Sequence, residues 1–380
     1  MASTLTFPSA MNQFAATVRA DAVAKLDATH YVIAYNVSGG GNGVAVVCSI
    51  SGTTITLGTP NTFLTTTSEN FAVCGLDATH FVVYYKNSSD GSEYVVCGVT
   101  SGTTITSYGT PVAVVTNTGS ENGGPQSIAM LDSTHFVCSY YNNNDTNSYC
   151  VVGSVSGSTI TLGTPNSHSA NPTVGKYMPV SAIDSTHFFV SFNNGSPNVA
   201  SRVGSVSGTT ITYGTASNFT SPHNSLNMAN FPIDSTHIGN AWISGAGGDG
   251  GAIYVVIGVI SGTTISSWGT GTSVGITANN NANLSAIGID ASNYALCYNL
   301  ASTGFATSSL GTISGTTPTL SAGVQFDNQA IDTTVVNTSS TALLDSTHFV
   351  TIWKRGTATT GQSIIGLLTA ATNGNFLSFM

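Results

Sequence analysis

The residues in this sequence best suited to chemistry are an aspartate and a histidine that recur with fixed spacing, as Asp-x-Thr-His. The phrases "LDATHYVIAY" from Leu26 and "LDATHFVVYY" from Leu76 are two of the copies. A carboxylate three residues from an imidazole suits metal binding or general acid–base catalysis. A catalytic site is usually needed once, however, whereas this motif is repeated along the whole chain. We therefore expect a structural role, in which Asp and Thr hold a tight turn and the histidine bridges to a neighbouring turn.

The motif occurs seven times, and successive copies start 50 to 56 residues apart. Asn293 replaces the histidine in one degenerate copy. The copies start at Leu26, Leu76, Leu131, Ile183, Ile233, Ile289 and Leu344. The residues that we assign to the structural turn are Asp27, His30, Asp77, His80, Asp132, His135, Asp184, His187, Asp234, His237, Asp345 and His348. Such a period indicates a repeat architecture that fills the chain, residues 1–380, as one domain.

A second phrase, "SGTTIT" from Ser51 and Ser101, alternates with the first. Between the two phrases each repeat contains four apolar segments, which in the second copy are "NFAVCGL", "HFVVYY", "YVVCGVT" and "TITSYGTPVAVV". β-Branched and aromatic residues fill these segments, and Gly, Asn, Asp and Ser separate them, as is typical of strands and turns. This pattern therefore predicts four antiparallel strands in each repeat, and we expect no helix of ordinary length.

The second strand indicates how the repeats pack. In "HFVVYY" the alternating positions are apolar on both faces, so this sheet must be covered on both sides. Four-stranded sheets stacked around an axis meet that requirement, and the sequence predicts an all-β, seven-bladed β-propeller. A β-solenoid is the alternative, although its coils are usually shorter and need end caps. Small residues place the first strand at the crowded centre, and threonines place the fourth at the outer edge.

The amino-terminal "TLTFPSAMNQF" is similar to the fourth-strand phrase "ITLGTPNTFL". We expect it to supply the outer strand of the last blade and so close the ring, which removes a sheet edge. The carboxyl-terminal "NGNFLSFM" is the alternative source of that strand.

Charge and composition exclude several classes of function. Lys and Arg number only seven and the formal net charge is −9, which argues against nucleic-acid binding. We expect no membrane insertion and no classical signal peptide, because no long apolar run and no basic leader is present. The six cysteines include no CxxC pair, so we expect free buried thiols, no metal and no cofactor.

The two rims of such a propeller differ in their sequences. One carries the repeated turns and hairpins, whereas the loops after the second and fourth strands differ in every blade and lie on the other. Variable loops on a rigid scaffold are where binding residues usually lie. The candidate binding residues on this variable rim are Asp90, Glu93, Asn142, Asp145, His168, Tyr177, His223, Asp249, Lys354 and Arg355.

The phrases "LDSTHFVCSY" from Leu131 and "GSVSGSTITLGTP" from Gly153 resemble the repeats of propeller-type proteins common in phage and environmental viral genomes. The resemblance covers essentially all of the chain, implies a virion or appendage protein, and supplies no catalytic residue. We expect a non-enzymatic surface protein, on a virion or outside the cell, for structural decoration or for attachment to a host surface or glycan. Its expected partners are other virion or appendage proteins and a host glycan or receptor. A free soluble lectin and, less favoured, a glycan-active hydrolase are the alternatives.

Overall fold

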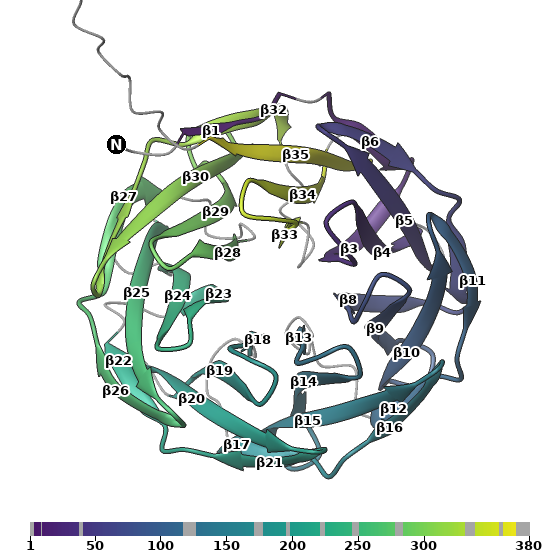
Figure 1. Ribbon diagram of the computed structural model, residues 1–380, viewed down its shortest axis with the longest axis horizontal. Coiled ribbons are helices and arrows are strands. Elements are labelled where there is room, and N and C mark those ends of the chain that lie inside the picture. Colours follow the sequence, from purple (N-terminus) through teal and green to yellow (C-terminus); the bar gives the residue numbers. More distant parts are fainter. Residues whose placement is uncertain are drawn as a thin grey trace, which may run out of the picture.

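Seven antiparallel β-sheets surround a central axis in the computed structural model (Figure 1). Each sheet is one blade, so the predicted seven-bladed β-propeller is confirmed. Blades 1 to 6 begin at β3, β8, β13, β18, β23 and β28, and blade 7 contains β33 to β35 together with β1 and β2. The structure describes residues 4–8, 10–37, 41–116, 127–170, 178–194, 198–220, 225–244, 251–277, 284–330, 339–356 and 360–369.

Four strand positions build each blade from the axis outward, in the predicted order. The first strands lie nearest the axis and are β3 (Val18–Lys25), β8 (Ser68–Gly75), β13 (Ser127–Met130), β18 (Val180–Ala182), β23 (Ser225–Asp234), β28 (Leu284–Asp290) and β33 (Ser339–Leu343). The second strands are β4 (His30–Val37), β9 (His80–Asn87), β14 (His135–Asn142), β19 (His187–Asn193), β24 (His237–Ser244), β29 (Asn293–Asn299) and β34 (His348–Lys354). The third strands are β5 (Gly43–Ser51), β10 (Ser92–Ser101), β15 (Asn147–Ser156), β20 (Asn198–Ser207), β25 (Ala252–Ser261), β30 (Phe305–Ser314) and β35 (Gly361–Thr369).

The fourth strand is broken into two segments that both pair with the third strand. The first segments are β6 (Thr54–Leu57), β11 (Thr104–Tyr108), β16 (Thr159–Leu162), β21 (Thr210–Tyr213), β26 (Thr264–Trp268) and β31 (Thr317–Leu320). The second segments are β7 (Asn61–Leu64), β12 (Val112–Val115), β17 (Asn166–Ala170), β22 (Ser217–Thr220), β27 (Thr272–Thr277) and β32 (Val324–Ala330).

In blades 1 to 3 the break falls at a Gly-Thr-Pro phrase, where the chain passes close to the next blade. A Cβ atom added to Gly109 would lie 1.9 Å from the carbonyl oxygen of Ser158, in the hairpin of blade 3. The equivalent Cβ on Gly58 would lie 2.3 Å from the carbonyl oxygen of Thr103 in blade 2. The glycine therefore recurs because backbone from the neighbouring blade occupies the space that a side chain would need.

The core lies between the blades, because the second strand is buried on both faces. All six residues from Phe81 to Lys86 of β9 are buried. One cluster joins Val32 and Val47 of blade 1 to Phe81 and Val83 of blade 2. The apolar pattern of this strand is thus explained by blades that cover it from both sides.

The ring is closed by the amino-terminal segment. Two short strands, β1 (Thr4–Thr6) and β2 (Asn12–Ala15), both pair antiparallel with β35 and form the outer strand of blade 7. The predicted closure by an N-terminal strand is confirmed, whereas the alternative segment, residues 373–380, lies outside the described residues.

All six cysteines are buried, and each has a free thiol. Burial raises the pKa of the Cys48 thiol to about 12, so this thiol stays protonated and unreactive at neutral pH. Among the described residues there is no helix long and apolar enough to cross a membrane.

Candidate binding surface

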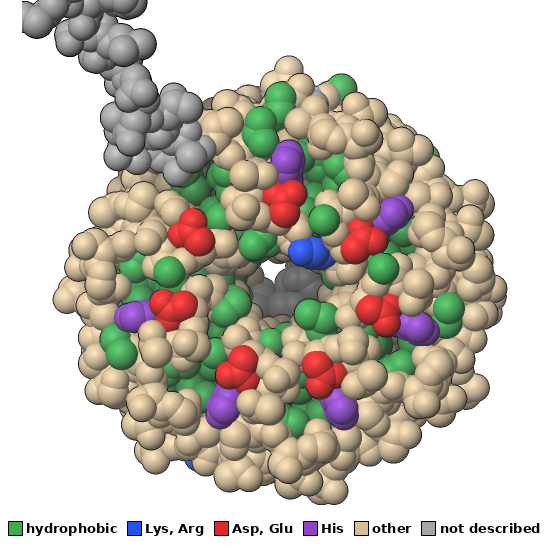
Figure 2. Space-filling model, in the orientation of Figure 1, with side chains coloured by type: hydrophobic (Ala, Val, Ile, Leu, Met, Phe, Trp, Pro, Cys, Tyr) green, Lys and Arg blue, Asp and Glu red, His purple; other side chains and the backbone are tan. Residues whose placement is uncertain are grey.

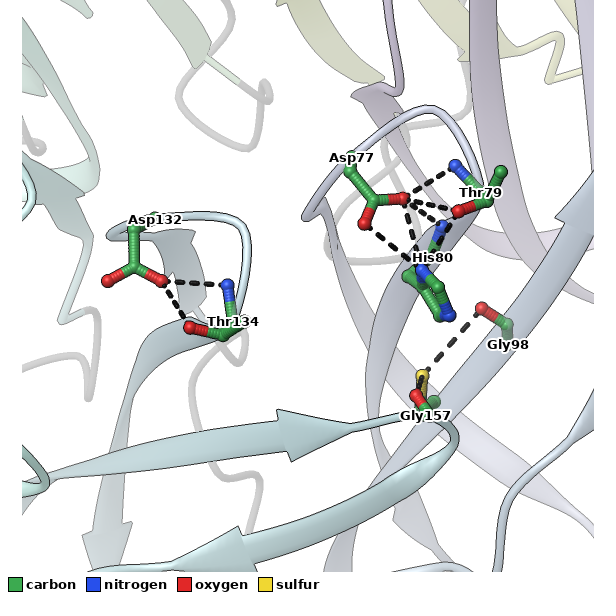
Figure 3. Close-up of polar contacts among 8 residues, drawn as sticks. Asp77, Thr79, His80, Gly98, Asp132, Thr134 and Gly157 are labelled. Atoms are coloured by element: carbon green, nitrogen blue, oxygen red, sulfur yellow. Dashed lines mark hydrogen bonds and ion pairs between the residues drawn. The ribbon is translucent and has the colours of Figure 1, made fainter.

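The Asp-x-Thr-His motif forms a self-contained turn between the first and second strands. In blade 2 the Asp77 carboxylate accepts hydrogen bonds from the Thr79 amide at 2.6 Å, the Thr79 hydroxyl at 2.8 Å and the His80 amide at 2.8 Å (Figure 3). The His80 Nδ1 atom lies 3.1 Å from the same carboxylate. The imidazole therefore stabilises its own turn. We expected the histidine to bridge to a neighbouring turn, and the structure shows this local contact instead.

The turn contacts its hairpin through the backbone instead. The Thr79 carbonyl accepts a hydrogen bond from the Thr100 amide at 2.8 Å, at the end of the third strand of the same blade. The same geometry recurs in the other complete copies, where the histidine Nδ1 lies 3.0 Å from an aspartate Oδ2. In the degenerate copy the Asn293 side-chain amide lies 2.9 Å from both oxygens of Asp290, so it replaces the imidazole as donor.

These turns give one face of the propeller a ring of acidic side chains. In Figure 2 the carboxylates surround the central opening, and each histidine lies farther from the axis than the acid beside it. Within the described residues no group of three His, Cys, Asp or Glu side chains is arranged to hold a metal ion. Because each donor pairs within its own turn, the arrangement suits turn stabilisation rather than metal coordination.

Acid should weaken these turns. Partial burial opposes ionisation of Asp345, but hydrogen bonds from Thr347 and His348 outweigh it and lower the pKa of that carboxyl to about 2. The other five carboxyl pKa values are lowered in the same way. A depressed folded-state pKa contributes stability above the unfolded value, and that contribution is lost as the pH falls through the folded value. We expect the denaturant midpoint to fall between about pH 4 and pH 2, and less steeply in Asp345→Asn. A midpoint that stays constant over this range, or an unchanged slope in the variant, would contradict the assignment.

The opposite rim is built from loops of neighbouring blades. The connector that follows β7 in blade 1 reaches the loop between β9 and β10 of blade 2. There the Thr66 hydroxyl donates to the Asn87 side-chain oxygen at 3.2 Å, and the Ser88 amide donates to the Thr67 carbonyl at 2.9 Å. The variable rim is therefore a composite surface, as a binding surface made from several loops requires.

One group of polar and aromatic side chains gathers in the blade 2 loop. The exposed Asp90 carboxylate accepts hydrogen bonds from the Ser92 amide at 2.8 Å, the Tyr94 hydroxyl at 2.9 Å and the Asn87 side chain at 3.2 Å. The ring of Tyr94 stacks on the buried Tyr85, with centroids 5.9 Å apart and planes at 22°. The loop thus presents a carboxylate, an amide and a partly exposed aromatic ring, which we name the blade 2 constellation.

The blade 3 loop contains the same arrangement. The Asp145 carboxylate accepts from the Asn147 amide at 3.0 Å, the Tyr149 hydroxyl at 2.6 Å and the Asn142 side chain at 3.3 Å. The Tyr149 ring stacks on Tyr140, with centroids 5.5 Å apart and planes at 20°. We name this group the blade 3 constellation.

The tyrosine hydroxyls in both constellations remain protonated donors. The hydrogen bond to Asp90 is the main cause that raises the pKa of Tyr94, and the bond to Asp145 does the same for Tyr149. Each carboxylate can therefore accept hydrogen bonds from the loop and still face solvent, because both aspartates are exposed.

The backbone of the blade 3 loop is strained where that of blade 2 is not. Thr146 has a φ of 59°, in the left-handed region, and the equivalent residue in blade 2 is Gly91 with a φ of 72°. A β-branched residue rarely adopts this conformation.

Replacing Thr146 with glycine should therefore stabilise the protein. We expect the free energy of unfolding to rise by about 0.5–1 kcal/mol, since relief of about 1–2 kcal/mol of strain exceeds the added chain entropy. Ser89→Gly, at an exposed position without positive φ, is the control and should lower stability slightly. Denaturant titration of both variants measures the difference, and a loss of stability in Thr146→Gly would show that the threonine is not strained.

Three other candidate residues are buried or partly buried, and Arg355 is the partly buried one. Glu93 is 3% exposed and accepts a hydrogen bond from the Tyr84 hydroxyl, and Lys354 is 6% exposed. Arg355 forms two hydrogen bonds with the buried carboxylate of Asp327, at 2.7 and 2.9 Å. The structure thus gives these residues internal contacts instead of the surface positions expected from the sequence, because they belong to strands or follow one directly.

His168 is a further correction. It is 2% exposed, and its ring lies 5.1 Å from that of Phe192 in the next blade. In blade 1 the equivalent position is Phe63, whose ring lies 5.4 Å from that of Tyr85. Burial, and then the charge of Arg202, lower the pKa of His168 to about 3, so the imidazole is neutral and packs like an aromatic ring. Tyr177, His223 and Asp249 lie outside the described residues.

The structure also shows residues that the sequence reasoning missed. Asn87, Tyr94 and Tyr149 belong to the two constellations, and their signal is the shared spacing Asn-x-x-Asp-x-x-x-Tyr. A second signal is an aromatic residue five positions after the motif histidine or its replacement in every repeat. These residues are Tyr35, Tyr85, Tyr140, Phe192, Trp242, Tyr298 and Trp353, and all are buried.

The fold places the chain among the β-propellers. No family model and no curated protein matches it. Among solved structures it is similar to AofleA from Arthrobotrys oligospora, with a TM-score of 0.52 and 10% sequence identity over 86% of this chain and 94% of that one. It is also similar to the SapL1 lectin solved in complex with alpha methyl fucoside, with a TM-score of 0.52 and 12% identity over 82% of this chain and 96% of that one. At these identities the likeness shows a shared fold.

Proposed function

We propose that this protein is a non-enzymatic β-propeller that binds carbohydrate through its variable rim. The observation that carries the proposal is the pair of constellations in blades 2 and 3. Each presents an exposed carboxylate in a loop, an amide at the end of the strand before it and a tyrosine ring on the strand after it. Sugars offer hydroxyl donors on their edges and apolar C–H groups on their faces, and these groups match an acidic acceptor beside an aromatic ring.

The fold supports the proposal in a second way. The SapL1 lectin, which has the same fold, was solved with a fucoside bound. The scarcity of charge also favours a ligand recognised by hydrogen bonds and stacking, since charged residues form only 6% of the chain.

The test is binding of the full chain to immobilised neutral and anionic glycans. We expect binding to a neutral glycan that changes little with salt, because few charges take part. Asp90→Asn combined with Asp145→Asn should weaken it about tenfold or more, the usual effect of losing hydrogen bonds to a charged group. Ser88→Ala, in the same loop, is the control and should bind normally. Failure to bind any glycan, or full binding by the double variant, would contradict the proposal.

We further propose that this binding attaches a virion or extracellular appendage to a glycan-bearing surface. The resemblance of the repeats to those of viral propellers supports this location. Antibody labelling of purified particles in the electron microscope should show the protein at their surface, and binding of the particles to cells should fall when free protein is added. Recovery of the protein only as a free molecule would favour the alternative, a soluble lectin.

A further inference from the structure

The two constellations are copies of one arrangement in successive blades. The aspartate–tyrosine contacts are 2.9 and 2.6 Å, and the aspartate–amide side-chain contacts are 3.2 and 3.3 Å. The stacked tyrosines meet at 22° and 20°. Both stacks join directly opposed residues of the second and third strands, so the same register places them.

The copies agree even where their sequences do not. The residue after each aspartate has positive φ in both loops, although it is Gly91 in one and Thr146 in the other. Both loops also contact the connector of the preceding blade. Asn87 accepts from Thr66, and the Asn144 side chain donates to the Thr116 carbonyl at 3.4 Å. The two surfaces are thus matched in side chains and backbone, and both contact the preceding blade, through a different residue in each loop.

The hydrogen-bonding capacity of each copy indicates the kind of unit it takes. A carboxylate has about four acceptor positions, and in each loop one backbone amide, one side-chain amide and one tyrosine hydroxyl occupy three of them. The remaining position and the phenol oxygen accept hydrogen bonds. The negative charge repels acidic sugars, so the copies suit a hydroxyl donor without charge.

We infer that the blade 2 and blade 3 constellations are two copies of one neutral-sugar site and bind two units of the same repeating glycan, which makes this part of the variable rim bivalent. The inference rests on the proposed function and adds to it the ligand class and the number of sites. Two linked sites convert the second binding step into an intramolecular one, which raises the affinity for a repeating ligand without any new contact.

The experiment removes one site at a time. Tyr94→Leu and Tyr149→Leu each keep apolar cover over the buried partner tyrosine but remove the ring and its hydroxyl. Asp90→Asn and Asp145→Asn are milder replacements for the same sites, and Ser88→Ala is the control. The monovalent probes are alpha methyl fucoside and the methyl glycosides of neutral hexoses, titrated by calorimetry. The multivalent probes are the same sugars coupled to a polymer. Circular dichroism melting confirms that each variant is folded.

Each single aspartate variant should weaken one sugar site per chain by about tenfold. Each single tyrosine variant should lose one site per chain and keep the other at unchanged affinity. On the polymer the same single change should weaken binding by roughly 100-fold, in the range expected for lost avidity, and changing both sites should abolish it. If either single change abolishes monovalent binding, the two loops form one site and bivalency is wrong, although carbohydrate binding stands. If the polymer binds equally to the single variants and the unaltered chain, bivalency is also wrong. If no probe binds the unaltered chain, the proposed function fails together with the inference.

Discussion

A chain that lacks residues 1–15 is expected to lose most of its stability, because these residues close the ring. β1 and β2 are the outer strand of blade 7, and their pairing with β35 joins residues more than 340 positions apart, as in Leu5 with Leu368. Leu5 and Phe14 are also buried, and burial of such side chains is worth about 1.5–3 kcal/mol each. The total loss, on the order of 5 kcal/mol or more, is a large part of the stability of an ordinary domain.

Denaturant unfolding followed by circular dichroism measures this loss. Phe14→Ala should reproduce about 3–5 kcal/mol of it by leaving a cavity. Gln13→Ala, an exposed change in the same strand, is the control and should have little effect. A peptide of residues 1–15 added to the truncated chain should restore part of the lost stability. An unchanged midpoint after truncation would show that the ring does not depend on this strand.

Replacing Asp327 with alanine is expected to destabilise the protein by about 3–5 kcal/mol, the effect of breaking a buried ion pair by removing one partner. Asp327 lies in β32 of blade 6, and its side chain is fully buried beside an Arg355 side chain that is 15% exposed. The same carboxylate accepts a hydrogen bond from the Trp353 indole at 2.7 Å, in β34 of blade 7. The substitution would leave the Arg355 guanidinium and the Trp353 indole without this acceptor, between two blades.

A double-mutant cycle separates this pair from general effects of mutation. Asp327→Asn with Arg355→Met should recover part of the stability lost in Asp327→Asn alone, since the second change removes the unpaired charge. Asp290→Ala, at an exposed turn carboxylate, is the control and should lose much less. A loss below about 1 kcal/mol in Asp327→Ala would show that the ion pair does not hold the blades together.

The sequence predicts where the variable loops lie better than it predicts which residues near them are exposed. The buried candidate residues show why. The sequence predicts that Glu93 and His168 lie on the rim, because polar residues near variable loops usually face water. Their strands instead direct them into the space between blades. There Glu93 accepts a hydrogen bond from Tyr84, and the His168 ring packs against Phe192. Asp90 and Asp145 remained exposed because they lie at loop tips, where no neighbouring strand covers them.

The sequence by itself determined the period, the strand order and the turn. The repeated phrases mark seven units, and the Asp-x-Thr-His hydrogen bonds join residues at most three positions apart, so local spacing is enough to predict them. Only the tertiary structure decided which terminus closes the ring, which polar residues are buried and which side chains form the constellations. Those outcomes depend on contacts between blades or on strand register, as between Tyr85 and Tyr94. The shared Asn-x-x-Asp-x-x-x-Tyr spacing marks the two loops, but it does not show which of their side chains the neighbouring blade covers.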